Sequence, residues 1–568
     1  MQEPVAPPSK DMSGQFYTFS DHYSAHAAPK SPFARGSISA DRAIPVVQVA
    51  GPVDPKSASK KPAYNGRLKR WPGILLLLLV CGAAAAAIVY FARKSNSSAT
   101  DRRDSVQQGL ADRARIQSGL DNPDPKRRDV VDDDGVINNP KVYPAMGCEL
   151  PNYQSKKGKI WAVSKNGTEV PVSIKGVNWF GMETGMQVPF GLWDNDKNGT
   201  TVYAIADFLS ANKFNSVRLP LCVDNILANA ELKDAVVNRV TNRALDLSSY
   251  LKLLQSVVKA LGYRRISVLI SMHTLEINNL KGNSLWYGVN TTESMFYTAV
   301  DMVTNALCGD DYWNVLGIDV KNEPSDGTWG TGEHNDFKLG AEAIANRMHK
   351  ICPKWMAFVE GVNDQHSITL DGEKMTYSDW HGGGLQKAGE LPPKFNLDHK
   401  LVYAPHYYTP AVFPQWYLFG GTGKVKDNAI IGYTELPGAQ LKGRVKDTMT
   451  DMFGYMNAQK GPAILLGEFA GLYTKDAHPL KTTQRCTKYT IENVIEEEYA
   501  GAYMWSLNPE SAYQYNPADT AGTFFEGLLE MDWRTVNGPF LKAMTGLDGM
   551  KDLKPMPCFP IEKAASKA

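Results

Sequence analysis

Eight short runs rich in Val, Ile and Leu recur between residues 172 and 510 of this 568-residue chain, and each is followed by polar residues and a longer amphipathic segment. Runs that are apolar on both faces, separated by stretches long enough for a crossover helix, are typical of a parallel sheet covered by helices. In order, the runs are VSIKGVNWFG, FNSVRLPL, ISVLISMH, VLGIDVKNEP, WMAFVEGV, LVYAPHYY, AILLGEFAG and AGAYMWSLNPE.

Eight strand–helix repeats over roughly 400 residues predict an α/β fold, a closed (β/α)8 TIM barrel with enlarged loops. Two helices are expected from apolar residues at helical spacing, one over residues 201–213 and one over Asn335–Ile351. An open, doubly wound sheet is the alternative. It usually carries a G-x-G-x-x-G loop after its first strand, and GVNWFGMETG lacks that spacing.

A stretch without charged side chains, Trp71–Phe91, precedes the repeats and has the length that a membrane-spanning helix needs. A secretory signal peptide would be shorter and would lie at the N-terminus. Basic residues precede the stretch, and every N-glycosylation acceptor follows it (Asn96, Asn166, Asn198 and Asn290). The sequence therefore predicts a single-pass type II membrane protein of the plasma membrane or secretory pathway, with the region after the stretch extracellular or luminal.

Composition completes the predicted domain organisation. Residues 1–70 read as a disordered cytosolic tail, 71–91 as a signal-anchor helix, 92–147 as a polar stalk, 148–548 as the barrel and 549–568 as a C-terminal extension. Within the stalk, Lys126–Arg128 resembles a dibasic processing site, although solvated charge is the alternative. With 61 basic and 60 acidic residues there is no net field that would attract nucleic acid.

Six cysteines follow the apolar stretch, an even number that allows up to three disulfide bonds. Zinc binding is the competing interpretation, but the chain has no C-x-x-C or H-x-x-x-H pair among them. We therefore expect disulfides, no metal and no cofactor. The six are Cys148, Cys222, Cys308, Cys352, Cys486 and Cys558.

Polar and ionisable side chains stand at the ends of most of the runs. In a barrel these ends meet at one rim, where such enzymes keep their chemistry. Burying several charges for packing alone is costly, so their coincidence indicates a functional site. The residues are Arg218, His273, Asn322, Glu323, His406, Tyr408, Glu468 and Trp505.

Two carboxylates facing each other across a rim suit glycoside hydrolysis, in which one protonates the leaving oxygen and the other attacks the anomeric carbon. Glu323 is predicted to be the proton donor and base, and Glu468 the nucleophile. Arg218 and Tyr408 would keep Glu468 ionised, while His406 would orient Glu323. Asn322 would hydrogen-bond a sugar hydroxyl.

The motifs DVKNEP, LLGEF, VRLP, APHYY and MWSLNPES resemble glycoside hydrolase family 5, the large cellulase family of retaining (β/α)8 enzymes. The resemblance covers about Cys148–Gly546. Further stretches, among them VNWFGMET, FVEGV and DWHGGGLQKAG, are closest to the bacterial-type endo-β-1,4-glucanases. The loop SMHTLEINN and the insertion around LFGGTGKVKDNAIIGYTELPGAQLKG depart from that pattern.

Tryptophans support a polymeric sugar substrate independently, because indoles stack on the apolar faces of sugar rings. Beside Trp505, the candidates in or after strand-end loops are Trp193, Trp286, Trp329 and Trp380; about two of the five are expected to belong to the core. The predicted partner is a β-glucan. Activity on β-1,3-glucan or mannan, or a non-catalytic wall-binding or sensing role, are the alternatives.

Overall fold

The computed structural model describes residues 130–277, 284–426, 429–516 and 522–561, together with Leu79, Cys81, Gly82 and Tyr90. The predicted tail and most of the predicted signal-anchor and stalk lie outside these residues. The account below concerns residues 130–561.

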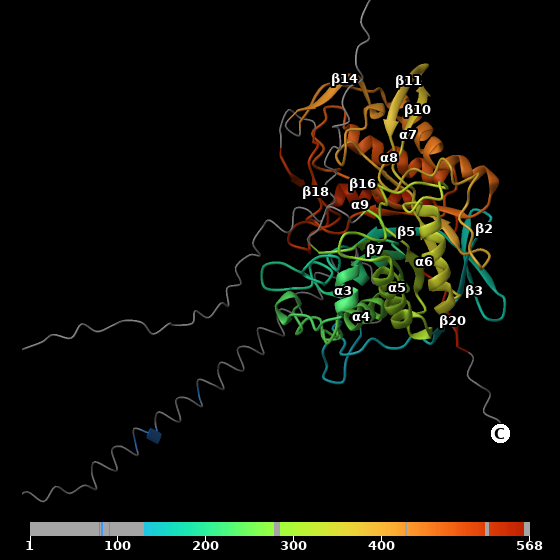
Figure 1. Ribbon diagram of the computed structural model, residues 1–568. Coiled ribbons are helices and arrows are strands. Elements are labelled where there is room, and N and C mark those ends of the chain that lie inside the picture. The colour runs from blue at the N-terminus through green and yellow to red at the C-terminus, as the bar shows by residue number, and fades with distance from the viewer. Residues whose placement is uncertain are drawn as a thin grey trace, which may run out of the picture. The chain divides into compact units, whose positions relative to one another are not determined.

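A closed parallel barrel forms the centre of this region (Figure 1). The last strand pairs in parallel with the first, Ala502 opposite Lys175, and this pairing closes the sheet and excludes the open arrangement. All eight predicted runs are strands, the sixth being split in two. They are β5 (Ile174–Asn178), β6 (Ser216–Cys222), β7 (Ser267–Thr274), β8 (Val315–Asp319), β9 (Met356–Val359), β12 (Leu401–Tyr403) with β13 (His406–Tyr408), β16 (Ala463–Ala470) and β17 (Gly501–Trp505).

Helices follow seven of the eight barrel strands. Several begin at a residue whose side chain accepts a backbone N–H of the first turn, as Thr201, Ser249 and Thr292 do, which explains where these helices start. Both predicted helices are present. The helices are α2 (Val202–Ala211), α3 (Val223–Ala228), α4 (Tyr250–Tyr263), α5 (Glu293–Leu307), α6 (Phe337–Ile351), α7 (Gly438–Met452), α8 (Thr482–Glu496) and α9 (Gly538–Met544).

The fifth connection differs from the predicted repeat. Between β9 and β12, where every residue is described, the chain forms a hairpin of β10 (Gln365–Leu370) and β11 (Glu373–Ser378) and no helix. Exposure alternates residue by residue along β10, the period of a strand. A second hairpin, β14 (Phe419–Lys426) with β15 (Ala429–Glu435), lies between β13 and α7.

Smaller elements complete this region. An antiparallel sheet of three strands precedes the barrel, one short strand pair joins the two ends of the region, and another follows the last barrel strand. The strands are β2 (Asn152–Lys156), β3 (Lys159–Val163), β4 (Glu169–Val172), β1 (Cys148–Glu149) with β20 (Phe559–Pro560), and β18 (Ala512–Tyr513) with β19 (Phe524–Phe525); the 3-10 helices are η2 (Asp234–Val236), η3 (Asp310–Tyr312), η4 (Trp416–Leu418), η5 (Gly454–Gln459) and η6 (Thr545–Gly549).

Two disulfide bonds form among the six cysteines. Cys148 is bonded to Cys558 beside the β1–β20 pair, and Cys308 is bonded to Cys352. The other two cysteines, Cys222 and Cys486, are buried as free thiols. The prediction of disulfides is confirmed, with two bonds of the three that the count allowed.

Residues 130–147, assigned above to the stalk, lie against the barrel region. Arg243 pairs with Asp132 at 2.6 Å and with Asp134 at 2.5 Å. Tyr143 is buried in the same hydrophobic core as the barrel. This last part of the predicted stalk therefore packs as part of the folded region.

The predicted type II membrane placement is overturned by one finding. A helix needs about 20 predominantly apolar residues to cross a bilayer. Within the ranges given above, no helix has both the length and the apolar character for that, and the longest helices of the barrel region have 15 residues. Of the stretch Trp71–Phe91 itself, only Leu79, Cys81, Gly82 and Tyr90 are among the described residues.

Candidate active site

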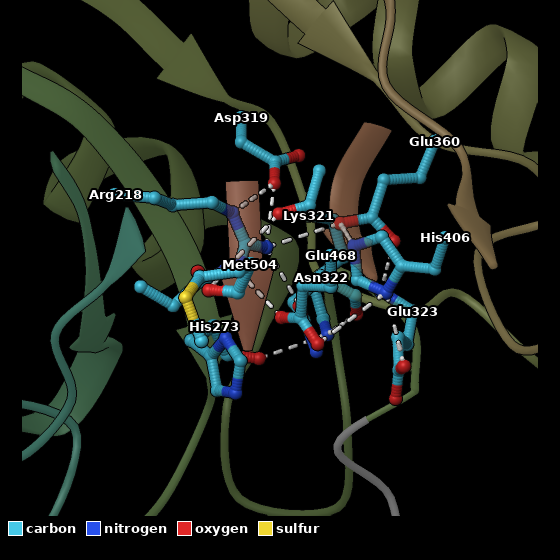
Figure 2. Close-up of polar contacts among 12 residues, drawn as sticks. Arg218, His273, Asp319, Lys321, Asn322, Glu323, Glu360, His406, Glu468 and Met504 are labelled. Carbon is cyan, nitrogen blue, oxygen red and sulfur yellow. Dashed lines mark hydrogen bonds and ion pairs between the residues drawn. The ribbon is translucent and has the colours of Figure 1, made fainter. Parts of the chain in front are cut away.

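Strands β6, β13 and β16, and the residues that directly follow β8 and β9, bring a group of charged side chains together (Figure 2). His406 and Glu468 lie directly opposite each other on the adjacent strands β13 and β16. Asn322 and Glu323 follow β8, and Glu360 directly follows β9. The group is almost wholly buried, and Glu323 is its most exposed carboxyl, at 17%.

Arg218 is the cation around which most of these side chains are arranged. Its Nε and Nη2 atoms donate to Asp319 Oδ2 at 3.0 and 2.7 Å, and Nη1 donates to Glu468 Oε1 at 2.5 Å. Further donations reach Asn178 Oδ1 and Asn322 Oδ1, at 2.9 and 2.8 Å. Arg218 is completely buried, so these bonds form in a region of low dielectric, where they are strong.

Glu468 receives hydrogen bonds from two directions. Besides Arg218, the Tyr408 hydroxyl donates to Glu468 Oε2. Burial raises the pKa of the Glu468 carboxyl, and the positive charges of His406 and Arg218 oppose that effect. These donors fix the carboxylate in one orientation and stabilise its charged form.

Glu323 sits in a left-handed backbone conformation, with φ of 45°. Its N–H donates to Glu360 Oε2 at 2.8 Å, and its Oε1 atom lies 3.1 Å from His406 Nδ1. Although burial acts to raise it, the pKa of Glu323 lies below its ordinary value because of the hydrogen bond with His406 and the charge of that ring. Glu323 and His406 thus form a pair able to hold a proton between them.

His406 lies among three carboxylates. Burial alone would lower its pKa, but the charges of Glu360 and Glu468 and the hydrogen bond with Glu323 raise the pKa of His406 well above its usual range. One carboxylate oxygen of Glu323, one of Glu468 and a ring nitrogen of His406 all lie within 4.8 Å of one another. Two carboxyl groups are therefore close together with an imidazolium between them.

Side chains of the type that bind metals are also grouped here. Asp319, Glu360 and His406 form one set, and Glu323, His406 and Glu468 form another. The guanidinium of Arg218 lies 2.7 Å from Asp319 and 3.2 Å from Glu360, so it faces the oxygens of the first set. Arg218 and His406 together supply positive charge to both sets.

Trp505 and His273 form a stack of rings beside the charged group. Trp505 lies between Phe180 and His273, with ring centroids 5.5 and 6.0 Å away and nearly parallel planes. Burial holds the pKa of His273 well below its ordinary value, so its ring is neutral. Lys321 donates to the His273 carbonyl at 3.2 Å, and burial lowers the pKa of this lysine to about 8.

The other candidate tryptophans lie in different environments. Trp380 contacts the site, since its ring meets that of Tyr408 edge-on at 6.0 Å. Trp193 is half-buried and packs edge-on against Trp533. Trp286 and Trp329 are buried against Phe337, with their N–H groups donating to Glu293 and to the Leu391 carbonyl.

The sequence-based reasoning omitted several residues that belong to the group. Glu360 lies in FVEGV and follows β9 as Asn322 and Glu323 follow β8, so its position at a strand end was a usable signal. Asp319 and Asn178 are the last residues of β8 and β5, but the sequence runs continue past them, so the pattern did not mark them as strand ends. His381, on the loop after β11, is close enough to Glu323 to interact with its charge, although burial lowers the pKa of His381 itself.

Comparison with known proteins agrees with this geometry. The profile of the family described as cellulase (glycosyl hydrolase family 5) matches residues 163–511. The "Major extracellular endoglucanase" of Xanthomonas campestris pv. campestris is 30% identical over 368 residues, covering 64% of this chain and 65% of that protein. An endoglucanase of Paenibacillus polymyxa is 27% identical over 394 residues, covering 68% of this chain and 84% of the relative.

Solved structures give the same result. A hyperthermophilic endocellulase of the archaeon Pyrococcus horikoshii is 26% identical, with a TM-score of 0.56, and the match covers 71% of this chain and 98% of that one. A complex of the P. horikoshii endocellulase with cellotetraose has the same identity and TM-score. These relatives and structural neighbours are endoglucanases and endocellulases, and this chain belongs to the cellulase family, glycosyl hydrolase family 5.

Proposed function

We propose that the chain is a retaining endo-β-1,4-glucanase, in which Glu468 is the nucleophile and Glu323 the proton donor and base. The observation that carries the proposal is the closeness of the two carboxyl groups, whose oxygens approach within 4.8 Å. Retaining enzymes separate their carboxyl groups by about 5 to 5.5 Å, whereas inverting enzymes need about 6.5 to 9.5 Å to place a water.

The surroundings of each glutamate support its role. Glu468 accepts from Arg218 and Tyr408, which orient an oxygen for attack on the anomeric carbon. Glu323 is the more exposed of the two and has His406 as a proton-holding partner. The proton carried by the Glu323–His406 pair passes from Glu323 to the glycosidic oxygen as that bond breaks.

The second step reverses the role of Glu323. After the leaving sugar departs, Glu323 is a carboxylate and can take a proton from water, which then attacks the glycosyl–Glu468 ester at the anomeric carbon. Glu468 is released as a carboxylate, and two displacements leave the product in the original β configuration. Trp505 and Trp380 border the reacting atoms and would contact the sugar through their edges, because Phe180 and His273 cover the two faces of Trp505 and Tyr408 packs against Trp380.

The β-1,4-glucan substrate is proposed from the relatives, since those compared above are named endoglucanases or endocellulases and one was crystallised with cellotetraose. To test it, the full chain is incubated with carboxymethylcellulose, laminarin and mannan. We expect reducing ends from carboxymethylcellulose, a fall in viscosity that precedes most of their release, and β-anomers as the first product by NMR. Release from mannan or laminarin alone would contradict the substrate, and α-anomers would contradict the mechanism.

A further inference from the structure

Glu360 is a fully buried carboxylate that contacts three parts of the site at once. Its Oε2 atom accepts the backbone N–H of Glu323 at 2.8 Å. Its Oε1 atom lies 3.1 Å from His406 Nε2 and 3.2 Å from Arg218 Nη2. Since Arg218 also binds Glu468, and His406 binds Glu323, this one side chain touches the supporting residues of both catalytic glutamates.

The first contact concerns the backbone of the proton donor. A left-handed φ at a non-glycine residue costs free energy and persists only where the surroundings enforce it. At Glu323 the enforcing contact is the hydrogen bond from its N–H to Glu360. This bond holds the residue in the conformation that brings its carboxyl to His406.

The second contact concerns the ring of His406, whose Nδ1 faces Glu323 and whose Nε2 faces Glu360. With a carboxylate oxygen 3.1 Å from each nitrogen, the imidazolium form of His406 is favoured. The charged or titratable groups that act on this ring are Glu323 after β8, Glu360 after β9, Glu468 on β16, His273 on β7 and His381 after β11.

The loop DWHGGG covers Glu360 closely. Gly382 has φ of +74°, and a Cβ built there would lie 2.3 Å from Glu360 Oε2 and 3.3 Å from His406 Cγ. The Gly382 carbonyl also accepts the N–H of Gly361 at 2.7 Å. Only a residue without a side chain lets this backbone lie on the carboxylate and shield it from solvent, which strengthens its interaction with His406.

We propose that Glu360 is a positioning residue that fixes the proton donor Glu323 and keeps His406 in its charged form. The proposal rests on the proposed function, in which Glu323 exchanges a proton with the glycosidic oxygen and with water. Glu360 acts through Glu323 and His406 and does not itself contact the substrate.

The test is Glu360→Gln in the full chain. A glutamine presents one N–H2 group, so it loses either the acceptor for the Glu323 N–H or the acceptor facing His406, and it loses the charge in both cases. We expect kcat on carboxymethylcellulose to fall about 10- to 100-fold, by analogy with residues that orient metal ligands, with KM nearly unchanged. The alkaline limb of the kcat profile should move about one pH unit downward, because His406 then loses its proton at lower pH.

Two variants serve as controls. Asp379→Asn removes another buried carboxylate of the same connection, one that contacts His366 and Gln386 outside the site, and should leave the alkaline limb unchanged. Glu360→Asp keeps the negative charge, so the alkaline limb of its kcat profile should stay near that of the parent chain. Its kcat should still fall, because the shorter side chain changes the hydrogen-bond geometry. This variant also serves if Glu360→Gln does not fold.

The His406 ring is followed by NMR of chains labelled with ¹⁵N-histidine, assigned by loss of its signal in His406→Asn. A fall in the His406 pKa in Glu360→Gln supports the positioning role, and this readout does not require the chain to cleave cellulose. An unchanged His406 titration together with an unchanged alkaline limb would overturn it. If no variant and no parent chain cleaves any glucan but the His406 pKa falls, the proposed function fails and the positioning role stands.

Discussion

Two buried cations on neighbouring barrel strands, Lys175 and Arg218, differ in the number of carboxylates around them. Lys175, near the start of β5, makes one ion pair with Asp548 at 2.7 Å, donates to the Asn212 carbonyl and lies over the Phe214 ring. Arg218, on β6, faces the acidic residues Asp319, Glu360 and Glu468. The charge of Lys175 is balanced by one carboxylate. Arg218 lies within 4 Å of three carboxylates, more than are needed to balance its charge.

This difference distinguishes a structural ion pair from a catalytic site. A single buried ion pair at best offsets its own desolvation and is replaceable by apolar packing. A group of carboxylates held at short range shifts the pKa values of its members, as it does for Asp319, whose pKa rises to about 8 chiefly through burial and the charge of Glu360. The following predictions test this contrast, from the largest effect to the smallest.

Glu468→Gln should abolish turnover on every substrate, a loss of at least about 10⁴-fold, because no nucleophile remains to form the glycosyl-enzyme. The change is isosteric. The remaining oxygen can accept from Arg218, and the Tyr408 hydroxyl can turn to accept from the new amide N–H, so the melting temperature and binding to cellulose should stay close to those of the parent chain. Initial rates and a cellulose pull-down provide the measurement. Activity above one-hundredth of the parent value would remove Glu468 from its role.

Glu323→Ala should lose about 10³-fold in activity on cellulose, since a poor leaving group requires protonation. An aryl glucoside with a good leaving group should still form the glycosyl-enzyme and then accumulate it. Added azide needs no base and should restore turnover, yielding a β-glycosyl azide identified by NMR. An α-glycosyl azide would mean that the two glutamates have the opposite roles.

Arg218→Lys should lower kcat about 10²- to 10³-fold. Lysine keeps the charge but lacks the planar set of donors that reaches Asp319, Glu468, Asn178 and Asn322 together. Steady-state kinetics measure the loss, and circular dichroism checks the fold. If this variant were as active as the parent chain, charge alone would explain Arg218 and the hydrogen-bond geometry would not matter.

Lys175→Met should leave kcat unchanged and lower the free energy of unfolding by about 1 to 3 kcal/mol. The cost is modest because Asp548 is partly exposed and keeps Lys213 as a partner at 3.2 Å. Urea unfolding followed by tryptophan fluorescence measures it. A large fall in kcat without a change in stability would show that Lys175, like Arg218, takes part in catalysis.

The fold and the main site residues could be predicted because their signals are local. Each barrel strand is a short run with its own apolar pattern. Glu323 and Glu468 stand at or near the ends of such runs, whereas Arg218, predicted at the end of its run, is the third of the seven residues of β6. The missing fifth helix was not foreseen, because the loop between β9 and β12 was counted as one more repeat. Its strand-like alternation appears only when exposure is known.

Other features depended on contacts that no local pattern reports. Trp286 and Trp329 look like their counterpart Trp505 in sequence, yet both are packed against Phe337 while Trp505 stacks on His273. The positions of the six cysteines in the sequence did not indicate which of them pair. In the structure, Cys148 is bonded to Cys558, 410 residues away. The position of Glu360 directly after β9 could be read from the strand pattern, but its contacts with Glu323, His406 and Arg218 could not.

The sequence by itself determined the eight strands and which polar side chains end them, since the period of apolar residues and the step from strand to loop are encoded within a few positions. The tertiary structure decided which of those side chains meet. Arg218 and Glu360 are separated by 142 residues and lie 3.2 Å apart only because β6 and β9 share one closed barrel. Closure of the barrel sets such distances, and with them the pKa of His406 and the separation of the two glutamates.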